Sequence, residues 1–372
     1  MKHYVICGNY GATNIGDEAV LDGILFELKS FFPQGTITVL SYNPDNTRCL
    51  HDVDSLPLLP FGIRSLYRCV FQGGLKKTLK AIRSCDIFFL GGGALFTDEK
   101  FFAILLWGWH FFIALLFHKP VYIYAQSLGP LDTFWGKHIC RWLFFRASFL
   151  SFRDKESIQF LESLGITHPA LFRPDPAFQI QTQSYHSLPF ELKKGSYIVV
   201  SIRDWIKKVD NFESLLASFF DEISLQYGLK FVFLPFQEIK DSDLLVLNKI
   251  FDLVKNKKNV HIFNFSFNKN TYQDVISLIA SAEMVIGMRL HCLIFATQSA
   301  IPFLPLCYSS KTWAFLRYLD YESYGLSIHD LTLDQLKEKF QTLYENRDQV
   351  RSHLISKEGI IKEHLQEVLK MV

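Results

Sequence analysis

The chain has 372 residues, of which 49% are hydrophobic and 36 are phenylalanine. Its net charge of +2 excludes the strong basic field typical of nucleic-acid binders, so no nucleic-acid partner is expected. The length predicts two domains, and the mean hydropathy of +0.13 leaves apolar surface beyond what two cores need. Seven scattered cysteines without a C-x-x-C pair, and a first apolar run too short for a signal peptide, predict a cytoplasmic protein.

Short apolar runs alternate with helical patterns in the first half of the chain. Strands are predicted over residues 4–7, 36–41, 87–90, 121–124 and 148–152, and helices over 17–32 and 154–164. This alternation predicts βαβ units and a mostly parallel sheet. Ligands of such sheets bind beyond the carboxyl ends of the strands.

A polar stretch without a clear period, residues 179–195, is interpreted as a linker. After it the alternation resumes, with strands over 197–202, 230–234, 260–263, 284–286 and 303–308, and helices over 212–227, 241–255, 272–282, 290–298 and beyond about residue 331. We therefore predict an α/β fold with two Rossmann-like doubly wound domains, residues 1–180 and 195–372, facing across a central cleft.

A basic and aromatic segment, residues 61–118, is predicted to face a membrane. Residues 61–85 contain six basic and no acidic side chains, in two short amphipathic helices broken at Gly73 and Gly74. Such a patch suits an anionic membrane surface, although an ordinary solvated helix face is the alternative. The nearly continuous apolar run 101–117 falls short of a bilayer span and contains His110, so it is predicted to be a buried or interfacial helix.

Two glycine-rich stretches in the first half follow predicted strands. The first, residues 8–18, ends in Asp17 and Glu18, which would repel a phosphate but suit hydroxyl recognition or general-base work. Capping of the next helix by Asp17 is the alternative. The second stretch, Gly91, Gly92 and Gly93, is typical of a loop that lets a phosphate or sugar approach the backbone.

Cationic side chains gather at predicted strand ends in both halves. Arg289 and His291 lie at the carboxyl end of the strand 284–286 and the amino end of the helix that follows it, where open α/β sheets bind anions. A cation beside a titratable imidazole indicates an anionic substrate and proton transfer, whereas local packing is the alternative. The further candidate binding residues are Arg153, Arg203, Lys311, Asn14 and Gln126. No metal site is predicted, because His and acidic residues do not cluster at ligand spacing.

Nine segments in order resemble the polysaccharide pyruvyl transferase family, in its bacterial cell-wall and exopolysaccharide branch. They are GNYGATNIGDEAVL (8–21), GGGALFTD (91–98), AQSLGPL (125–131), SFRDKES (151–157), PDPAF (174–178), SIRDW (201–205), PFQ followed by Asp241, GMRLHCLIFA (287–296) and YSSK (308–311). Asn9 and Ser309-Ser310 depart from residues frequent in the family, which affects the acceptor preference more than the donor.

The resemblance implies a GT-B-like arrangement of the two domains. It implies phosphoenolpyruvate as co-substrate, no cofactor, and transfer of pyruvate to a sugar of a cell-surface polysaccharide or its lipid-linked precursor, with formation of a ketal and release of phosphate. The N-terminal domain is then the acceptor side and the C-terminal domain the donor side. Donor contacts are expected from Arg153, His291 and Lys311, with Arg203 and Arg289 as neighbours.

The roles of the titratable residues remain hypotheses on this basis. His291 is the expected general acid for the methylene carbon of the donor, with phosphate binding as imidazolium the alternative. Asp17 or Glu18 is expected to deprotonate the acceptor. Two other classes share these features: a nucleotide-sugar glycosyltransferase of the GT-B type, and a non-catalytic scaffold in envelope assembly. A lipid-linked acceptor would place the protein at the inner face of the membrane.

Overall fold

The structure is a computed structural model, and it describes residues 1–62, 74–98, 101–180, 192–204, 211–237, 243–263 and 271–369. The chain divides into two compact units. The first comprises Met1–Ala12, Asp17–Ile180 and His364–Val372, and the second comprises Thr13–Gly16 and Gln181–Glu363. The predicted ranges 1–180 and 195–372 differ from these units at two places. They put Thr13–Gly16 in the first domain and His364–Val372 in the second, whereas the structure groups these segments the other way. Most of the predicted linker, 179–195, lies outside the described residues.

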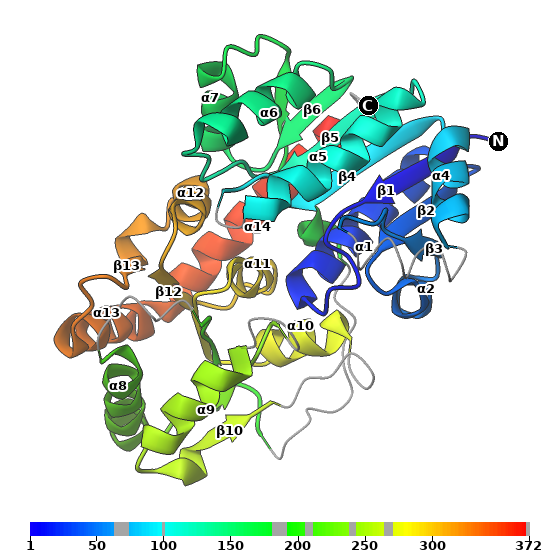
Figure 1. Ribbon diagram of the computed structural model, residues 1–372. Helices are drawn as coiled ribbons and strands as arrows, with labels where there is room; N and C mark the ends of the chain where they lie inside the picture. Colours follow the sequence, from blue (N-terminus) through cyan, green and yellow to red (C-terminus); the bar gives the residue numbers. More distant parts are fainter. Residues whose placement is uncertain are drawn as a thin grey trace. The chain divides into compact units, whose positions relative to one another are not determined.

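The first unit is built on a parallel sheet of seven strands in the order β3-β2-β1-β4-β5-β6-β7 (Figure 1). Its strands are β1 (His3–Cys7), β2 (Thr36–Ser41), β3 (Asp54–Pro57), β4 (Ile87–Gly93), β5 (Val121–Gln126), β6 (Phe149–Phe152) and β7 (Ala170–Phe172). Its helices are α1 (Ile15–Phe31), α2 (Pro44–His51), α4 (Gly74–Ser84), α5 (Phe101–Leu116), α6 (Phe134–Phe144) and α7 (Lys155–Ser163), with a 3₁₀ turn η1 (Pro176–Gln179).

The second unit is built on a parallel sheet of six strands in the order β10-β9-β8-β11-β12-β13. Its strands are β8 (Tyr197–Ser201), β9 (Lys230–Phe233), β10 (Val260–Ile262), β11 (Met284–Gly287), β12 (Phe303–Cys307) and β13 (Leu326–Ser327). Its helices are α8 (Phe212–Tyr227), α9 (Asp243–Leu253), α10 (Tyr272–Ala280), α11 (Leu290–Gln298), α12 (Ser310–Tyr318), α13 (Leu333–Glu345) and α14 (Arg347–Leu369), whose last residues belong to the first unit. The predicted α/β class with two doubly wound sheets is confirmed.

The core of the first unit has two layers of helices because its central strands are apolar on both faces. Val5, Phe88 and Leu90 point into one hydrophobic cluster, which α4, α5, α6 and α7 cover. On the other face, α1 packs so closely on β4 that a Cβ atom at Gly92 would lie 2.2 Å from Val20 Cγ1. Strands buried on both faces read as continuous apolar runs, which is why the central strands were predictable.

The apolar run 101–117 forms helix α5, and its polar residue is satisfied inside the protein. His110 is fully buried, its Nε2 accepts the backbone N–H of Leu59 at 2.9 Å, and its Nδ1–H donates to the Leu106 carbonyl at 2.8 Å. No helix in the described ranges is long and apolar enough to cross a membrane. The prediction of a buried or interfacial helix over a spanning one therefore agrees with the structure.

The second of the two predicted basic helices is α4, while the first lies in residues 63–73, outside the described part. The sequence patterns missed β3, β7, β13, α2, α6 and α12. The first two are short strands toward the sheet edge, and β3 contains Pro57. Helix α6 has a buried face formed by Gly136, Cys140, Leu143 and Phe144, but exposed aromatic residues on its other side obscure this stripe in the sequence.

His110 gives the fold a defined pH dependence. Burial lowers the pKa of His110 to about 4, whereas the unfolded chain titrates near 6.5. The unfolded state therefore binds more protons between these values, and stability from this group is lost as the pH falls from about 6.5 to 4. His110→Gln keeps an acceptor for the Leu59 N–H but does not titrate. We therefore expect the variant to lose about 3 kcal/mol less unfolding free energy on acidification than the original protein. Denaturant unfolding of the original protein and the variant at pH 7 and pH 4.5 measures this difference. Equal losses of unfolding free energy in the two proteins would contradict the role given to His110.

Candidate active site

The candidate residues lie where the strand order of each sheet reverses. In the first unit β1 stands between β2 and β4, and in the second unit β8 stands between β9 and β11. The loops that leave the carboxyl ends of two such strands diverge to opposite faces of the sheet, which leaves room for a ligand. The glycine-rich loop 8–12 and Gly93 follow β1 and β4, whereas Arg203 and Arg289 follow β8 and β11.

Three neighbouring strands of the second unit end in cationic side chains. β11 pairs with β8 on one side and with β12 on the other. Arg203 follows β8, and its Nη1 donates to the hydroxyl of Tyr308 at 2.8 Å, with the guanidinium 5.4 Å from the ring centroid. Tyr308 follows β12, so this contact joins the ends of two strands that are not adjacent. Lys311, in the first turn of α12, lies partly exposed at the same edge.

Arg289 is held by a buried carboxylate that the sequence patterns did not single out. Its Nε donates to Asp243 Oδ2 at 3.0 Å, and its Nη2 donates to Asp243 Oδ1. Asp243 is fully buried at the start of α9 and also accepts the backbone N–H of Phe236 at 2.9 Å. The charge of Arg289 is thus compensated within the protein, and the fork fixes the turn between β11 and α11. Asp243 could have been predicted as a partner because it is an acidic residue at the start of the helix after β9. The family pattern instead pointed to Asp241, which lies outside the described residues.

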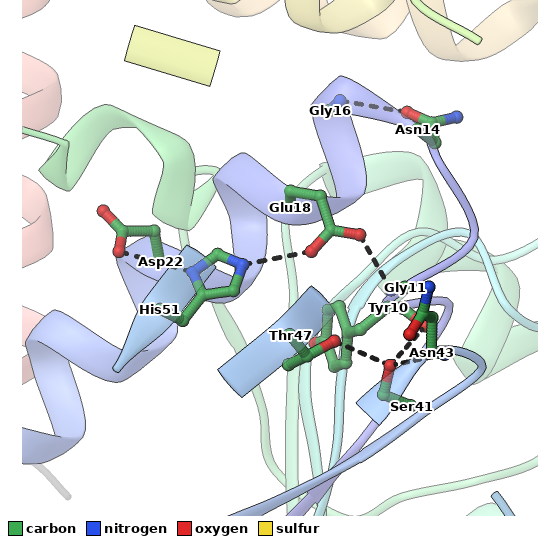
Figure 2. A network of polar contacts seen from close by, with 10 residues as sticks. All are labelled: Tyr10, Gly11, Asn14, Gly16, Glu18, Asp22, Ser41, Asn43, Thr47 and His51. Carbon is green, nitrogen blue, oxygen red and sulfur yellow. Dashed lines mark hydrogen bonds and ion pairs between the residues drawn. The ribbon is translucent and has the colours of Figure 1, made fainter. Parts of the chain in front are cut away.

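His291 lies in the first turn of α11, against a glycine from the N-terminal part of the chain. A Cβ atom at Gly16 would lie 2.1 Å from His291 Nδ1, so a larger residue at position 16 would displace the ring. Asn14 Oδ1 accepts the Gly16 N–H at 2.9 Å (Figure 2). The N–H of Ile15 donates to the Phe236 carbonyl at 3.0 Å. The segment Thr13–Gly16 is therefore fastened to the second unit, and Asn14 shapes the start of α1.

The three glycines of β4 have different surroundings. A Cβ atom at Gly91 would meet Ile24 at 3.1 Å, and Gly92, with φ +69°, has the close contact to α1 described above. Gly93 has φ +81°, and among the described residues a Cβ atom there would have only Asp17 Oδ1 within 4 Å, at 3.4 Å. Gly91 and Gly92 thus permit helix packing, and Gly93 is the one beside a carboxylate.

Asp17 and Glu18 are adjacent in sequence but differ in their environment. Asp17 is partly exposed and its Oδ2 accepts a hydrogen bond from Asn9 Nδ2 at 2.7 Å. Glu18 is buried; its Oε1 accepts the Gly11 N–H at 2.8 Å and its Oε2 lies 3.0 Å from His51 Nε2 (Figure 2). Glu18 therefore holds the loop after β1, whereas Asp17 stands at the sheet edge.

His51 completes a buried polar network in the first unit (Figure 2). Its ring is fully buried, and its Nδ1 lies 3.6 Å from Asp22 Oδ1. Burial on its own lowers the pKa of His51, but the neighbouring carboxylates of Asp22 and Glu18 raise it overall. The network ties α2 to α1 and so steadies the loop that Glu18 holds.

Gln126 and Arg153, at the ends of β5 and β6, are both engaged within the first unit. Gln126 is fully buried, its Nε2 donates to the Leu90 carbonyl at 3.2 Å and its Oε1 accepts the Leu95 N–H at 3.3 Å. Arg153 Nη1 lies 2.5 Å from Oδ2 of the buried Asp175. These contacts shape the loops after β4 and β5, which surround Gly93.

The second unit offers an electrostatic environment for an anion. Helices α11 and α12 begin at Leu290 and Ser310, directly after the adjacent strands β11 and β12. The N-terminal ends of these helices carry partial positive charge, which adds to the cations of Arg203 and Lys311. Within the described ranges, His, Cys, Asp and Glu do not gather in threes at distances that would hold a metal ion. The arrangement suits a ligand with more than one negative group.

Sequence comparison finds relatives over most of the chain. A family profile described as polysaccharide pyruvyl transferase matches residues 14–310. The chain is also 22% identical over 392 residues to the protein named Amylovoran biosynthesis protein AmsJ from Erwinia amylovora, and the alignment covers 94% of this chain and 94% of that protein.

Two solved structures share the fold. HepE of Anabaena in complex with UDP and glucose superposes with a TM-score of 0.66 at 10% identity, over 99% of this chain and 98% of that one. The UDP-GlcNAc 2-epimerase of Neisseria meningitidis bound to UDP-GlcNAc gives a TM-score of 0.63 at 14% identity, over 99% and 100%. At these identities the likeness shows the fold alone, and it confirms the GT-B-like class.

The Arg289–Asp243 pair is expected to make a large contribution to stability. Asp243→Asn leaves a mostly buried guanidinium without its counter-charge, which we expect to cost about 3 kcal/mol of unfolding free energy. The double variant Asp243→Asn with Arg289→Gln should recover part of that loss, because no unpaired charge remains. Lys249→Gln, which removes an exposed partner 4.0 Å from Glu213, is the control and should change stability by under about 0.5 kcal/mol. Additive losses in the double variant would refute the coupling.

Proposed function

The chain belongs to the polysaccharide pyruvyl transferase family, and we propose that it transfers pyruvate from phosphoenolpyruvate to a sugar, forming a ketal and releasing phosphate. Membership of the family implies a transferase that acts on polysaccharide. The relative named for amylovoran biosynthesis supports a cell-surface polysaccharide, or its lipid-linked precursor, as the acceptor class. The observation that carries the proposal is that Arg203 and Lys311 lie at the same edge of the second sheet as the N-terminal ends of α11 and α12.

The donor has a carboxylate and a phosphate, so it needs several positive groups in one place. Arg203 presents a planar guanidinium that suits either group, and Lys311 adds a compact charge at the start of α12. The N-termini of α11 and α12 supply further donors. Arg289, neutralised by Asp243, acts in this proposal as a positioning residue that sets the turn carrying His291.

The reaction needs one proton at carbon and two hydroxyls of the acceptor. We assign the first proton to His291, which delivers it to the methylene carbon of phosphoenolpyruvate and leaves an oxocarbenium-like centre. One sugar hydroxyl then forms a C–O bond to that centre and gives its proton to Asp17. Proton exchange with water restores Asp17 and His291 between turnovers. A second hydroxyl forms another C–O bond while the C–O bond to phosphate breaks, and its proton leaves with the phosphate.

Asp17 is the better of the two carboxylates for deprotonating the acceptor. It is partly exposed beside Gly93, and Asn9 orients one of its oxygens. Both oxygens of Glu18 are engaged by Gly11 and His51, so Glu18 holds the loop instead. The first unit therefore serves the acceptor and the second unit serves the donor in this proposal.

The proposal predicts acceptor-dependent release of phosphate from phosphoenolpyruvate. We expect a product heavier than the acceptor by the pyruvate ketal, measured by mass spectrometry across a panel of sugars and lipid-linked sugars. His291→Gln should lower kcat at least about 100-fold, because the general acid is lost. Lys258→Gln, an exposed cation just before the amino end of β10 and so away from the carboxyl ends of the strands, should leave turnover unchanged.

Two results would overturn the proposal. One is absence of both phosphate release and phosphoenolpyruvate binding by calorimetry. The other is turnover of a nucleotide sugar in its place, an outcome that the fold allows because the solved structures above bind UDP or UDP-GlcNAc.

Gly16 tests the placement of His291 without touching its chemistry. Gly16→Ala puts a methyl group where the imidazole lies, so we expect the ring to move and kcat to fall about 10- to 100-fold. Gly359→Ala is the matched control, because a Cβ atom there meets nothing within 4 Å and the helix should gain up to about 1 kcal/mol. Full turnover in Gly16→Ala would show that the ring position is unimportant, and thermal unfolding separates this effect from misfolding.

A further inference from the structure

Helix α5 of the first unit carries an apolar stripe on its outer face. Its inner face fills the core, with Trp107 and Phe111 buried in the hydrophobic cluster. Phe102, Trp109 and Phe112 point outward and are 65%, 39% and 42% exposed, and Leu116 continues the same stripe. The spacing of these residues by three, four and seven positions places them on one side of the helix. None of these four side chains carries a charge.

Helix α6 extends the stripe sideways with aromatic side chains. Phe134 and Trp135 at its start are 64% and 74% exposed, and Trp142 is 42% exposed. The Trp142 ring centroid lies 6.3 Å from that of Phe112 on α5, so the two helices form one continuous aromatic surface. Figure 1 shows α5 and α6 in the first unit, on the side of the sheet that they cover together. Ordinary protein surfaces expose apolar side chains singly, whereas these aromatic side chains form one continuous cluster. Such a cluster indicates an interaction surface.

Basic side chains border this aromatic surface, and acidic ones are absent from the three helices that form it. Helix α4 exposes Lys76, Lys77, Lys80 and Arg83. Helix α6 exposes Arg141, and Arg146 just beyond its end lies 4.2 Å above the Trp142 ring. The sequences of α4, α5 and α6 contain no Asp or Glu. The surface is therefore both apolar and positively charged.

The apolar surface continues inward between α4 and α5. Trp109 lines a cavity of about 460 Å³ together with Leu75 and Leu79 of α4 and Ile113 of α5. Its walls are almost entirely apolar, and none of the candidate active-site residues lines it. The cavity joins the basic helix α4 to the aromatic stripe of α5.

We propose that the outer surface of α4, α5 and α6 binds an anionic lipid bilayer in its interfacial layer. Trp and Phe side chains favour the boundary between headgroups and acyl chains, and Lys and Arg are attracted to anionic headgroups. The sequence indicates a membrane-facing segment at 61–118, and the structure adds α6 to it. Binding of this kind is independent of the reaction proposed above.

Charge decides between a bilayer and a second copy of this chain. A two-fold symmetric dimer through this surface would bring the same Lys and Arg residues of both copies together without acidic partners from these helices. Such like charges repel, whereas an anionic leaflet is complementary to them. The aromatic composition fits the bilayer interface as well, because the rings are amphipathic or apolar and rigid.

Vesicle flotation tests the proposal with the whole 372-residue chain. We expect it to float with phosphatidylcholine vesicles that contain about one third phosphatidylglycerol, and much less with pure phosphatidylcholine. Trp135→Ser with Trp142→Ser should weaken the partition coefficient at least about tenfold. Lys76→Gln with Lys80→Gln should weaken it about fivefold per charge removed, and high salt should do the same.

Matched controls and a second measurement keep the test decisive. Leu225→Ser with Ile355→Ser removes apolar side chains of the second unit that are 86% and 61% exposed, and it should leave flotation unchanged. Absence of binding to anionic vesicles, or binding that the Trp double variant retains, overturns the proposal. Analytical ultracentrifugation covers the remaining alternative: a lipid-free dimer that dissociates in Trp135→Ser with Trp142→Ser would assign the surface to self-association instead.

Discussion

The parallel alignment of the strands is the constraint on which the candidate site depends. It brings every strand's carboxyl end to one edge of its sheet, and the reversals at β1/β4 and β8/β11 open a space at that edge. The two units use this space differently. The first places the carboxylate of Asp17 beside Gly93, and the second places Arg203 and the His291 turn after β8 and β11. One geometry thus presents an acidic group in one unit and cations in the other.

Gathering charges at an edge requires compensation, and the structure supplies it with buried carboxylates. Asp243 holds Arg289 as Asp175 holds Arg153, and both carboxylates are buried. Breaking such a pair strands a charge away from water, which is far more costly than losing a surface ion pair. The compensated arginines therefore set backbone geometry. Chemistry in the proposal is left to Asp17 and His291, which are both partly exposed.

The sequence was sufficient for the central strands and for the place of Arg289 and His291, because apolar runs and turn residues are local signals. It was insufficient for the partners of those residues. Asp243 lies 46 positions before Arg289, and Gly16 contacts a histidine from a distant part of the chain. No periodicity links positions so far apart. In the sequence the three glycines of β4 cannot be told apart. The structure distinguishes them, because α1 packs on Gly91 and Gly92 whereas Gly93 lies beside Asp17.

Helix α5 shows how a sequence can satisfy two apolar environments at once. A helix that is apolar on all sides belongs in a core or in lipid, because either exposed face is unfavourable in water. The sheet covers one face of α5, and His110 on that side is fully bonded to backbone groups, so its polarity does not oppose burial. On the other face, Phe102, Phe112 and Leu116 stay substantially exposed within the described part of the first unit. An apolar helix that is too short to span a bilayer can still lie on its surface with these side chains in the interfacial layer.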